Sequence, residues 1–453
     1  MTPSLRFAPS PTGYLHFGNL RTAVLNYLYA KKHGGHFLLR LDDTDRERST
    51  DAYADQIRTD LKWLGFSWDR EARQSDRTAR YEEAASQLKA SGRLYPCYET
   101  ADELDRRRKR QLASGRPPIY DRAGLKLSAA ERAALEAEGR VAHWRFRLAN
   151  AAEGSTAPKH TNVVWNDLIR GTQSVDLGSL SDPVLIRADG TFLYTFTSVV
   201  DDIDFKITHV IRGEDHVTNT GVQIDLFRAL DAAPPAFAHH ALLVATGDQK
   251  MSKRSGDMAL LSSRDLEPMA VASYVALIGT SDAIEPKRTI ADLAATLDLG
   301  HVSTSAARFD LDELRALNAR YLHATPFAEV ASRLAAMGVG GGEAFWNAVR
   351  GNLTVLDDAK QWWQVVSGEI APIIEDAGFL TRAMDLLPPE PWTEATWGEW
   401  TNAVKAATGA KGRALFHPLR LALTAAESGP ELKALLPLIG RKKVLARLSG
   451  HPG

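Results

Sequence analysis

A chain of 453 residues is longer than one compact core supports, so we expect about three domains. Its 44% hydrophobic and 25% charged residues are ordinary for a globular protein, and no apolar run approaches the roughly 18 residues that a membrane span needs. The formal net charge of −1 excludes a uniformly basic nucleic-acid coat but permits a basic face on a balanced body. We therefore expect no membrane partner.

The first elements along the chain predict a parallel α/β unit. Residues 4–8 form an apolar strand that ends at a proline, and residues 18–33 form a helix that stops at a glycine pair. A second apolar strand, FLLRL at 37–41, ends at the acidic cluster DDTD. Ligands of parallel sheets bind beyond the carboxyl ends of the strands, so the loop PSPTGYLHFGN and DDTD should lie close together.

The rest of the chain divides by composition and periodicity. A helix over 51–64 precedes a region with a basic run, a Pro-Pro pair and short strand-like stretches, which indicates an insertion at 95–182. Strand and helix patterns alternate again over 183–240, and from about residue 260 the pattern is nearly all helical. The predicted parts are 1–94, 95–182, 183–240, 241–310 and 311–453.

The single cysteine, Cys97, excludes an intramolecular disulfide. The N-terminus lacks the continuous apolar stretch of a secretory signal. Both features favour a reducing compartment, and we expect a cytoplasmic protein.

The segment HFGN holds two polar residues where the first long helix should begin. His16 and Asn19 are at positions i and i+3, on one face of the first turn, and Gly18 lets a flat ligand approach the backbone. A helix N-terminus also favours phosphate. Taken alone, the segment favours the plainer interpretation, a polar helix start that is capped by its own side chains, over a ligand site.

A second motif, GDQKMSKRSGD at 247–257, is basic and bounded by glycines. Its cations Lys250, Lys253 and Arg254 could close as point charges over a polyphosphate, although many such loops are only solvated turns. The pairing of KMSKR with HFGN favours a nucleotide site.

The two motifs resemble the HIGH and KMSKS elements of class I aminoacyl-tRNA synthetases. RFAPSPTGYLHFGNLRTA, DDTDRERS, VVDDIDFKITHVIRGEDHVTNT and KMSKRSGD resemble bacterial glutamyl-tRNA synthetases, and the similarity covers essentially the whole chain. The resemblance implies an α/β fold: a Rossmann-like parallel-sheet catalytic domain in two halves with an α+β insertion that binds the acceptor arm. A region with the KMSKS loop and stem contacts would follow, and then an all-helical anticodon-binding part.

The implied reaction is ATP-dependent ligation of L-glutamate to tRNA(Glu) through a glutamyl-adenylate, with release of AMP and diphosphate. The nucleophilic α-carboxylate is already ionised at pH 7, so the site must supply alignment and charge stabilisation rather than a general base. The resemblance gives catalytic roles to His16, Asn19, Lys250 and Lys253. ATP, with Mg²⁺, would be bound by these four residues together with Gly18, Asp215, His216 and Arg254.

The glutamate site needs cations for the side-chain carboxylate, preferably a guanidinium fork. Arg6 and Arg212 match the family's arginines at this site, and the other matching positions are Ala8, Ser10, Asp42 and Tyr194. Asp42 stands in DDTD where many relatives have a glutamate that holds the substrate ammonium. Because its side chain is one methylene shorter, we expect it to use a water or a backbone shift. HFGN also departs from HIGH, but Asn19 can still hydrogen-bond ribose.

Some relatives bind structural zinc in the insertion through a Cys-x-Cys pair, a tyrosine and a third cysteine. This chain keeps only Cys97 and Tyr120 at the matching positions, with Glu99 and Gly124 where cysteines would be. One thiolate does not make a structural zinc site. We therefore expect no structural zinc and a buried Cys97.

The implied partner is tRNA(Glu), and we expect a monomer. Candidate tRNA contacts are Arg106, Arg107 and Arg108 in the insertion, which could also be a solvated helix face, and Arg413 and Arg420 near the end. Trp362 and Trp363 should belong to the core. Two alternatives stay open: a non-discriminating form that also glutamylates tRNA(Gln), and a catalytically silent tRNA-binding paralogue.

Overall fold

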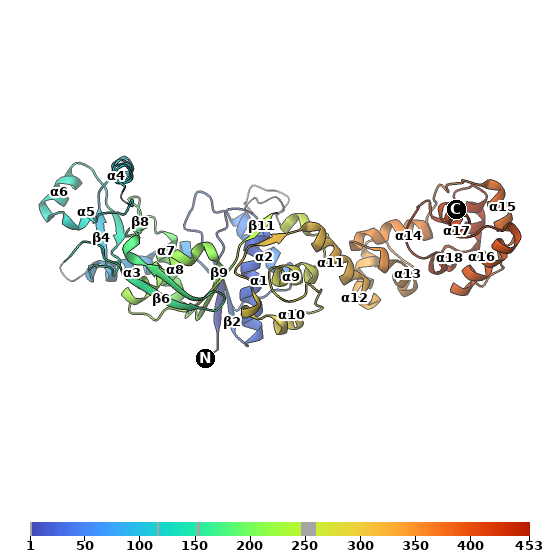
Figure 1. The fold of residues 1–453 in the computed structure, drawn as a ribbon, viewed down its shortest axis with the longest axis horizontal. Coiled ribbons are helices and arrows are strands. Elements are labelled where there is room, and N and C mark those ends of the chain that lie inside the picture. The colour runs from blue at the N-terminus through green and yellow to red at the C-terminus, as the bar shows by residue number, and fades with distance from the viewer. Residues whose placement is uncertain (1, 116, 152–154, 246–259) are drawn as a thin grey trace. The chain divides into compact units, whose positions relative to one another are not determined.

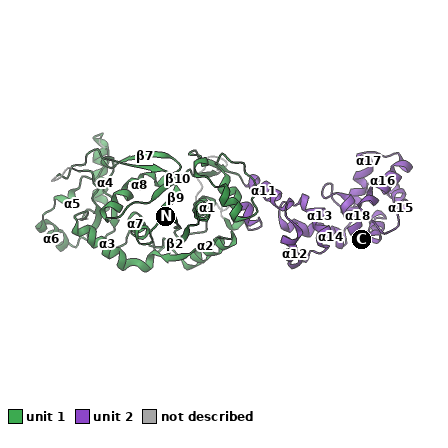
Figure 2. Cartoon of the chain, turned by 90° about the horizontal axis from the view of Figure 1, so that it is seen from below, with its two compact units in different colours: residues 1–263, 272–310 green, residues 264–271, 311–453 purple. Residues whose placement is uncertain are grey.

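A computed structural model describes the whole chain except residues 1, 116, 152–154 and 246–259 (Figure 1). The described residues form two compact units (Figure 2), of which unit 1 comprises residues 1–263 and 272–310 and unit 2 comprises residues 264–271 and 311–453. Within the described ranges, no helix is long and apolar enough to cross a membrane.

Unit 1 begins with the predicted parallel unit. The strands β1 (Ser4–Phe7), β2 (His36–Leu41) and β3 (Arg70–Arg73) pair in parallel in the order β1-β2-β3. The helix α1 (Phe17–Lys32) connects β1 to β2, and α2 (Asp51–Trp63) leads from β2 towards β3. Both helices end before a glycine with positive φ, Gly34 at 60° and Gly65 at 79°, which is a common helix terminator. The predicted strand–helix–strand order is therefore confirmed.

The sheet continues through strands from the middle of the chain. A four-stranded sheet has the order β7-β6-β10-β9, in which β10 pairs in parallel with β9 and β6, and β7 pairs antiparallel with β6. The amide of Thr208, just before β9, donates to the Ser4 carbonyl of β1 at 2.9 Å, so the two sheets meet between β1 and β9. The bounds are β6 (Asn162–Asp167), β7 (Gly171–Asp176), β9 (His209–Gly213) and β10 (Ala236–His240).

The helices of this part are α3 (Thr78–Ala90), α7 (Tyr194–Asp204) and α8 (Val217–Ala229), with short 3₁₀ turns η1 (Gln74–Arg77) and η3 (Glu214–His216). Buried side chains of α3, α7, α8 and the strands share one core, which contains Phe196, Val199 and Phe227. These elements form a Rossmann-like α/β layer arrangement, as the sequence predicts.

A small antiparallel sheet, β4-β5-β8, lies in the predicted insertion and just beyond it. Its strands are β4 (Leu94–Cys97), β5 (His143–Phe146) and β8 (Val184–Ile186), and its helices are α4 (Ala101–Ala113), α5 (Ala123–Lys126) and α6 (Ala129–Ala137). Thr100 with Glu103 and Ser128 with Glu131 form capping boxes that fix the starts of α4 and α6.

The strands β6 and β7, although inside residues 95–182, belong to the sheet of β9 and β10. The five-part division by residue number stays a prediction.

The remaining elements of unit 1 include a short parallel pair, β11 (Leu243–Ala245) with β12 (Ala307–Phe309), and α10 (Ile290–Thr296). The chain passes between the units after residues 263, 271 and 310, and the second of these boundaries falls within α9 (Pro268–Leu277). The strand β12 is a three-residue exception within the range that we predicted to be nearly all helical. Three residues are too few to show a period of two.

Unit 2 is helical and has its own core. Trp346 and Trp400 are fully buried, Trp362 is buried and Trp363 packs against the same cluster, which confirms the core prediction for the tryptophan pair. The helices are α11 (Leu311–His323), α12 (Phe327–Ala336), α13 (Gly342–Val349), α14 (Ala359–Ser367), α15 (Ala377–Asp385), α16 (Glu394–Thr408), α17 (Arg413–Thr424), α18 (Leu432–Ile439) and α19 (Arg441–Leu448).

Candidate active site

A cavity of about 450 Å³ opens at the carboxyl ends of β1, β2, β9 and β10, close to the place where β1 and β9 meet. This is the edge at which parallel sheets bind ligands. The cavity is lined by every site residue predicted for glutamate or ATP that lies in the described ranges: Arg6, Ala8, Ser10, His16, Gly18, Asn19, Asp42, Tyr194, Arg212, Asp215 and His216. Lys250, Lys253 and Arg254 lie outside the described residues.

His16 is fixed at the start of α1 by its own helix. It is the N-cap residue, and its Nδ1 accepts a hydrogen bond from the Asn19 amide at 3.3 Å. A Cβ on Gly18 would lie 3.1 Å from both Cε1 and Nδ1 of His16. The missing side chain at position 18 therefore gives the imidazole its place over the first turn.

Replacing Gly18 with alanine should displace the His16 ring by a few tenths of an ångström. We expect the KM for ATP to rise about fivefold to tenfold, because small misplacements of binding groups are costly in a preorganised site. The free energy of unfolding should not fall, since alanine suits a helix better than glycine by roughly 0.5–1 kcal/mol. Steady-state kinetics and urea unfolding measure the two effects. Gly398→Ala, in α16 with open space around its Cβ, is the matched control, and an unchanged KM in G18A would contradict the packing role.

Arg212 is a buried cation whose hydrogen-bond partners, within the described ranges, include no carboxylate. It lies near the end of β9 and donates to Tyr194 Oη at 3.1 Å, Thr220 Oγ1 at 2.6 Å, Gln223 Oε1 at 2.7 Å and His239 Nε2 at 3.3 Å. All four acceptors are neutral groups, and burial lowers the pKa of Arg212. A guanidinium held in this way is prepared for an anion in the cavity.

His239 is oriented by a residue from a neighbouring strand. Its Nδ1 lies 2.5 Å from Asp167 Oδ2, which leaves Nε2 to accept from Arg212 and to face Thr220. Burial tends to raise the pKa of Asp167, but hydrogen bonds from His239 and the Arg170 amide lower it to about 2. The carboxylate therefore stays ionised and holds the imidazole in place. Asp167 and His239 are not among the predicted site residues, and their only signal in the sequence is a polar position at the end of an apolar strand.

Arg40 organises a cluster of carboxylates below the cavity. Its Nε and Nη2 donate to the two oxygens of Asp42 at 2.7 and 3.0 Å, and its Nη1 donates to Asp202 Oδ1 at 2.8 Å. Asp201 Oδ2 lies 3.6 Å from Arg40 Nε, and Arg6 Nε donates to Asp202 at 3.2 Å. Arg6 and Asp42, both predicted site residues, are thus positioned by Arg40 and Asp202, which were not predicted. An arginine inside the apolar run FLLRL was the available signal.

Asp42 is held rigidly but in an unfavourable environment for its charge. Burial raises its pKa to about 6, although Arg40 acts in the opposite direction. Asp42 lines the cavity, but only 5% of the residue is exposed to solvent. Its protonation state can therefore change in a range of pH where most aspartates stay ionised.

Asp215 and His216 lie in the turn after β9. Asp215 is exposed, and its Oδ1 lies 2.7 Å from the position that a Cβ on Gly213 would occupy, so a larger residue at 213 would require the Asp215 carboxylate to shift. Burial, together with the charge of Arg212, lowers the pKa of His216 to about 4, and its ring packs against Tyr194 at a centroid distance of 5.5 Å. The His216 imidazole is therefore neutral at pH 7.

The predicted tRNA contacts lie on two helices. All residues of α4 are at least partly exposed; Arg106 and Arg107 line a cavity of about 800 Å³ and Arg108 is exposed. Arg107 also forms ion pairs with Asp121 at 2.6 Å and Glu99 at 3.4 Å. Arg413 begins α17 and is exposed, whereas Arg420 is partly buried and donates to the Pro430 carbonyl at 3.1 Å.

Residues 4–316 match the family model described as tRNA synthetases class I (E and Q), catalytic domain, and residues 375–451 match the model described as anticodon binding domain. The chain belongs to this class I synthetase family. The predicted resemblance and fold class are thereby confirmed.

Curated relatives of this synthetase are similar over their full length. The chain is 56% identical to "Glutamate--tRNA ligase 2" of Methylorubrum populi, with 99% of each chain covered, and 57% identical to the protein of that name from a Methylobacterium species, with 100% of each covered. It is 55% identical to "Glutamate--tRNA ligase 1" of Brucella ovis, over 99% of this chain and 100% of that one.

Solved structures are similar to this synthetase along the same length. The crystal structure of a glutamate tRNA ligase from Elizabethkingia meningosepticum in complex with its amino acid has a TM-score of 0.84 at 26% identity, and covers 99% of this chain and 98% of that one. The glutamate-tRNA synthetase of Elizabethkingia anophelis has a TM-score of 0.83 at 26% identity, with 99% of each chain covered.

Proposed function

We propose that this synthetase ligates L-glutamate to tRNA(Glu) in two steps, through a glutamyl-adenylate, and releases AMP and diphosphate. The observation that carries the proposal is Arg212, a buried cation with four neutral hydrogen-bond partners in the same cavity as His16. The names of the full-length relatives support glutamate as the amino acid.

The glutamate side chain would be bound through its carboxylate. Arg212 and Arg6 present guanidinium groups to the cavity, and Tyr194 Oη, 3.1 Å from Arg212, can turn towards the same anion. Asp42 would accept a hydrogen bond from the substrate ammonium with whichever lone pairs Arg40 leaves unused. Ala8 and Ser10, after β1, form the wall that a longer side chain would contact.

ATP would lie along the start of α1, where the helix N-terminus and the groups of His16, Gly18 and Asn19 face the cavity. Asp215 and His216 would contact the nucleoside. Lys250, Lys253 and Arg254, which are outside the described residues, would neutralise the phosphates together with Mg²⁺. A neutral His216 adds no positive charge that would compete with these cations for the phosphates.

In the first step, an α-carboxylate oxygen of glutamate attacks the α-phosphorus of ATP, and the bond to the bridging oxygen of diphosphate breaks. No proton needs to be removed because the carboxylate is ionised. In the second step, a hydroxyl oxygen of the terminal ribose attacks the glutamyl carbonyl carbon and the bond from that carbon to the phosphate oxygen breaks. AMP leaves, and the hydroxyl proton passes to the departing phosphate or to water. A neighbouring cavity of about 750 Å³ shares Ser10, Asp42 and Tyr194 with the first, and offers the ribose an approach.

The tRNA would be held by both units. Arg106, Arg107 and Arg108 are the candidates for the acceptor arm, and Arg413 and Arg420 lie within the residues that match the anticodon-binding model. Cations that hold phosphate should weaken binding of all tRNAs equally when they are removed, whereas one that reads a base should relax specificity.

Aminoacylation of purified tRNA(Glu) and tRNA(Gln), together with glutamate-dependent ATP–pyrophosphate exchange in the presence of tRNA, tests the proposal. We expect exchange and charging with tRNA(Glu). Charging of tRNA(Gln) in the same assay would reveal the broader specificity. Absence of exchange with every tRNA would mean a catalytically silent tRNA-binding protein.

The proposed role of Asp42 predicts a pH dependence of glutamate binding. Because the pKa of Asp42 is raised to about 6, lower pH protonates the carboxylate and removes the charge that holds the ammonium. The KM for glutamate should rise by about tenfold per pH unit below pH 6. Exchange assays from pH 5 to pH 8 at saturating ATP and tRNA measure this. Asp42→Asn should show a high, pH-independent KM, and a flat profile in the unaltered enzyme would rule out the role.

A further inference from the structure

Three buried residues from three neighbouring strands form a chain of hydrogen bonds that ends at the cavity. Asp167 is the last residue of β6, His239 lies in β10 and Arg212 lies in β9, and β10 runs between the other two strands. His239 Nδ1 lies 2.5 Å from Asp167 Oδ2, and Arg212 Nε donates to His239 Nε2 at 3.3 Å. Arg212 is the member of this chain that lines the cavity. Asp167 and His239 can therefore act on a ligand through Arg212.

The backbone determines which nitrogen of the His239 ring carries the proton. Asp167 Oδ1 accepts hydrogen bonds from the amides of Ile169 at 3.0 Å, Arg170 at 3.0 Å and His239 at 3.1 Å, so Oδ2 is the oxygen that faces the ring. An ionised carboxylate can only accept, so Nδ1 must be the donor. Burial lowers the pKa of His239, which keeps the ring neutral at pH 7. Its Nε2 is therefore an acceptor.

This acceptor fixes the orientation of the Arg212 guanidinium. Its Nε donates to His239, and its Nη2 donates to Thr220 Oγ1 at 2.6 Å and Gln223 Oε1 at 2.7 Å. Because a guanidinium is planar, these bonds also fix Nη1. One N–H of Nη1 donates to Tyr194 Oη at 3.1 Å, and the other has no acceptor in the described part of the chain. That last N–H is available to a ligand.

We propose that Asp167 and His239 are positioning residues, which keep the His239 proton on Nδ1 and thereby orient Arg212 Nη1 towards the side-chain carboxylate of the substrate. This inference rests on the proposed function, in which Arg212 binds that carboxylate. It adds that the affinity for glutamate depends on the position of one proton in a buried imidazole. The opposite tautomer would place an N–H against the N–H of Arg212 Nε.

Asp167→Asn tests the proposal with a side chain of the same shape. The three backbone amides still require an oxygen at the Oδ1 position, so the new NH₂ group must take the position of Oδ2. It donates to His239 Nδ1, and the ring proton moves to Nε2. There it can donate to Thr220 Oγ1, which lies 2.8 Å away, so the ring stays hydrogen-bonded and the fold should persist. The bond that is lost is the one from Arg212 Nε.

We expect the KM for glutamate in ATP–pyrophosphate exchange to rise about 10- to 100-fold in D167N. This is the range of losses that follows when the group that orients a metal-binding histidine is removed, and we expect the same range for a histidine that orients an arginine. The KM for ATP should stay within about twofold. Nitrogen-15 NMR of histidine-labelled protein should show that the proton of the His239 ring moves from Nδ1 to Nε2.

Asp176→Asn is the matched control. Asp176 Oδ1 accepts from the amides of Thr161 at 2.7 Å and Gly178 at 2.9 Å, and its Oδ2 lies 3.0 Å from Nδ1 of His160. The same exchange of carboxylate for amide is thus made beside a histidine, but this histidine is exposed and is not among the residues that line the cavity. The KM for glutamate should stay within about twofold in D176N.

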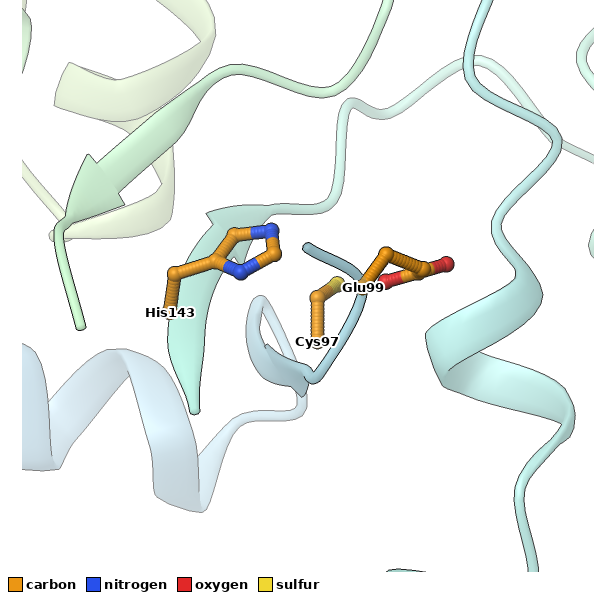
Figure 3. A group of neighbouring side chains, drawn as sticks. All are labelled: Cys97, Glu99 and His143. Atoms are coloured by element: carbon orange, nitrogen blue, oxygen red, sulfur yellow. The ribbon is translucent and has the colours of Figure 1, made fainter. Parts of the chain in front are cut away.

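A second variant removes the ring nitrogens altogether. His239→Phe should raise the KM for glutamate in the same range as D167N, and the NMR signals that it lacks identify those of His239. His143→Phe is its control. Figure 3 shows His143 beside Cys97 and Glu99 in the small antiparallel sheet, and the residue is partly buried and is not among those that line the cavity. H143F should therefore leave the KM for glutamate unchanged.

A double-mutant cycle with R212Q shows whether Asp167 acts through Arg212. In the R212Q background, D167N should lower kcat/KM for glutamate by less than about a further twofold, because the group that it orients is already gone. A full additional loss would overturn the proposal. So would an unchanged KM in D167N, or a D167N ring that keeps its proton on Nδ1. Absence of glutamate-dependent exchange in the unaltered protein would instead contradict the proposed function itself.

Discussion

Replacing Arg212 with glutamine is expected to raise the KM for glutamate strongly while the fold persists. Truncating one member of a buried, hydrogen-bonded charge pair costs about 2–5 kcal/mol of binding free energy. This corresponds to roughly a 30- to 5,000-fold loss of affinity. Arg212 donates to four neutral side-chain acceptors, and among the residues that the structure describes no carboxylate hydrogen-bonds to it. We therefore expect the carboxylate of the proposed substrate to neutralise its charge.

The stability of the R212Q protein separates a binding role from a structural one. Glutamine removes four hydrogen bonds but also removes the cost of burying an unpaired cation, so the free energy of unfolding should change by less than about 1.5 kcal/mol. The KM for ATP should stay within about twofold, because the proposed binding sites for glutamate and ATP use different residues of the cavity. Arg80→Gln, which breaks an ion pair with Asp204, is a control for arginine removal in the same unit. An unchanged KM for glutamate in R212Q would exclude Arg212 as the residue that binds the side-chain carboxylate of glutamate.

Replacing Arg40 with methionine should strongly lower the free energy of unfolding, whereas the main effect of R212Q should be on the KM for glutamate. Arg40 is fully buried and pairs with Asp42 and Asp202, so its loss would leave two buried carboxylates without their main partner. Breaking a buried ion pair from one side costs about 3–5 kcal/mol. We expect a loss of this size at pH 7 in the urea transition of the unit that contains the site, since two units can unfold separately.

The effect of R40M should also depend on pH. Asp42 already has a pKa of about 6 in the folded protein, above its unfolded value of 3.8, and losing Arg40 would raise it further. The folded state then binds more protons than the unfolded state, so stability increases as the pH falls from 7 towards 5. The loss measured at pH 5 should therefore be smaller than at pH 7. A loss below about 1 kcal/mol at pH 7 would show that surrounding groups compensate for the guanidinium.

Local sequence patterns were sufficient to predict the helices and strands near the cavity. Glycine terminators and apolar periodicity located α1 and α2, and the rule that ligands bind at the carboxyl ends of parallel strands correctly brought DDTD next to HFGN. The family motifs named residues that all lie in one cavity where the structure describes them. Their individual roles stay predictions, and Lys250, Lys253 and Arg254 are outside the described residues.

Long-range partners could not be predicted in the same way. Arg40 occupies a position in an apolar strand that pattern alone assigns to the core, and its partner Asp202 comes from α7, far along the chain. Asp167 and His239 meet because β6 and β10 are neighbours, which no local signal records. His143 reaches Cys97 through strand register, and a one-residue slip in register would have pointed it to the opposite face.

The junction between β1 and β9 has a consequence for synthesis of the protein on the ribosome. Until β9 emerges, β1 has an open edge, and Arg6 and Arg40 have no Asp202 to pair with. An unpaired strand edge and unpaired buried charges make a partial chain prone to aggregate. We therefore expect nascent chains that end before residue 200 to need chaperone protection, and the first half of the sheet to reach its native packing only when the second half has been translated.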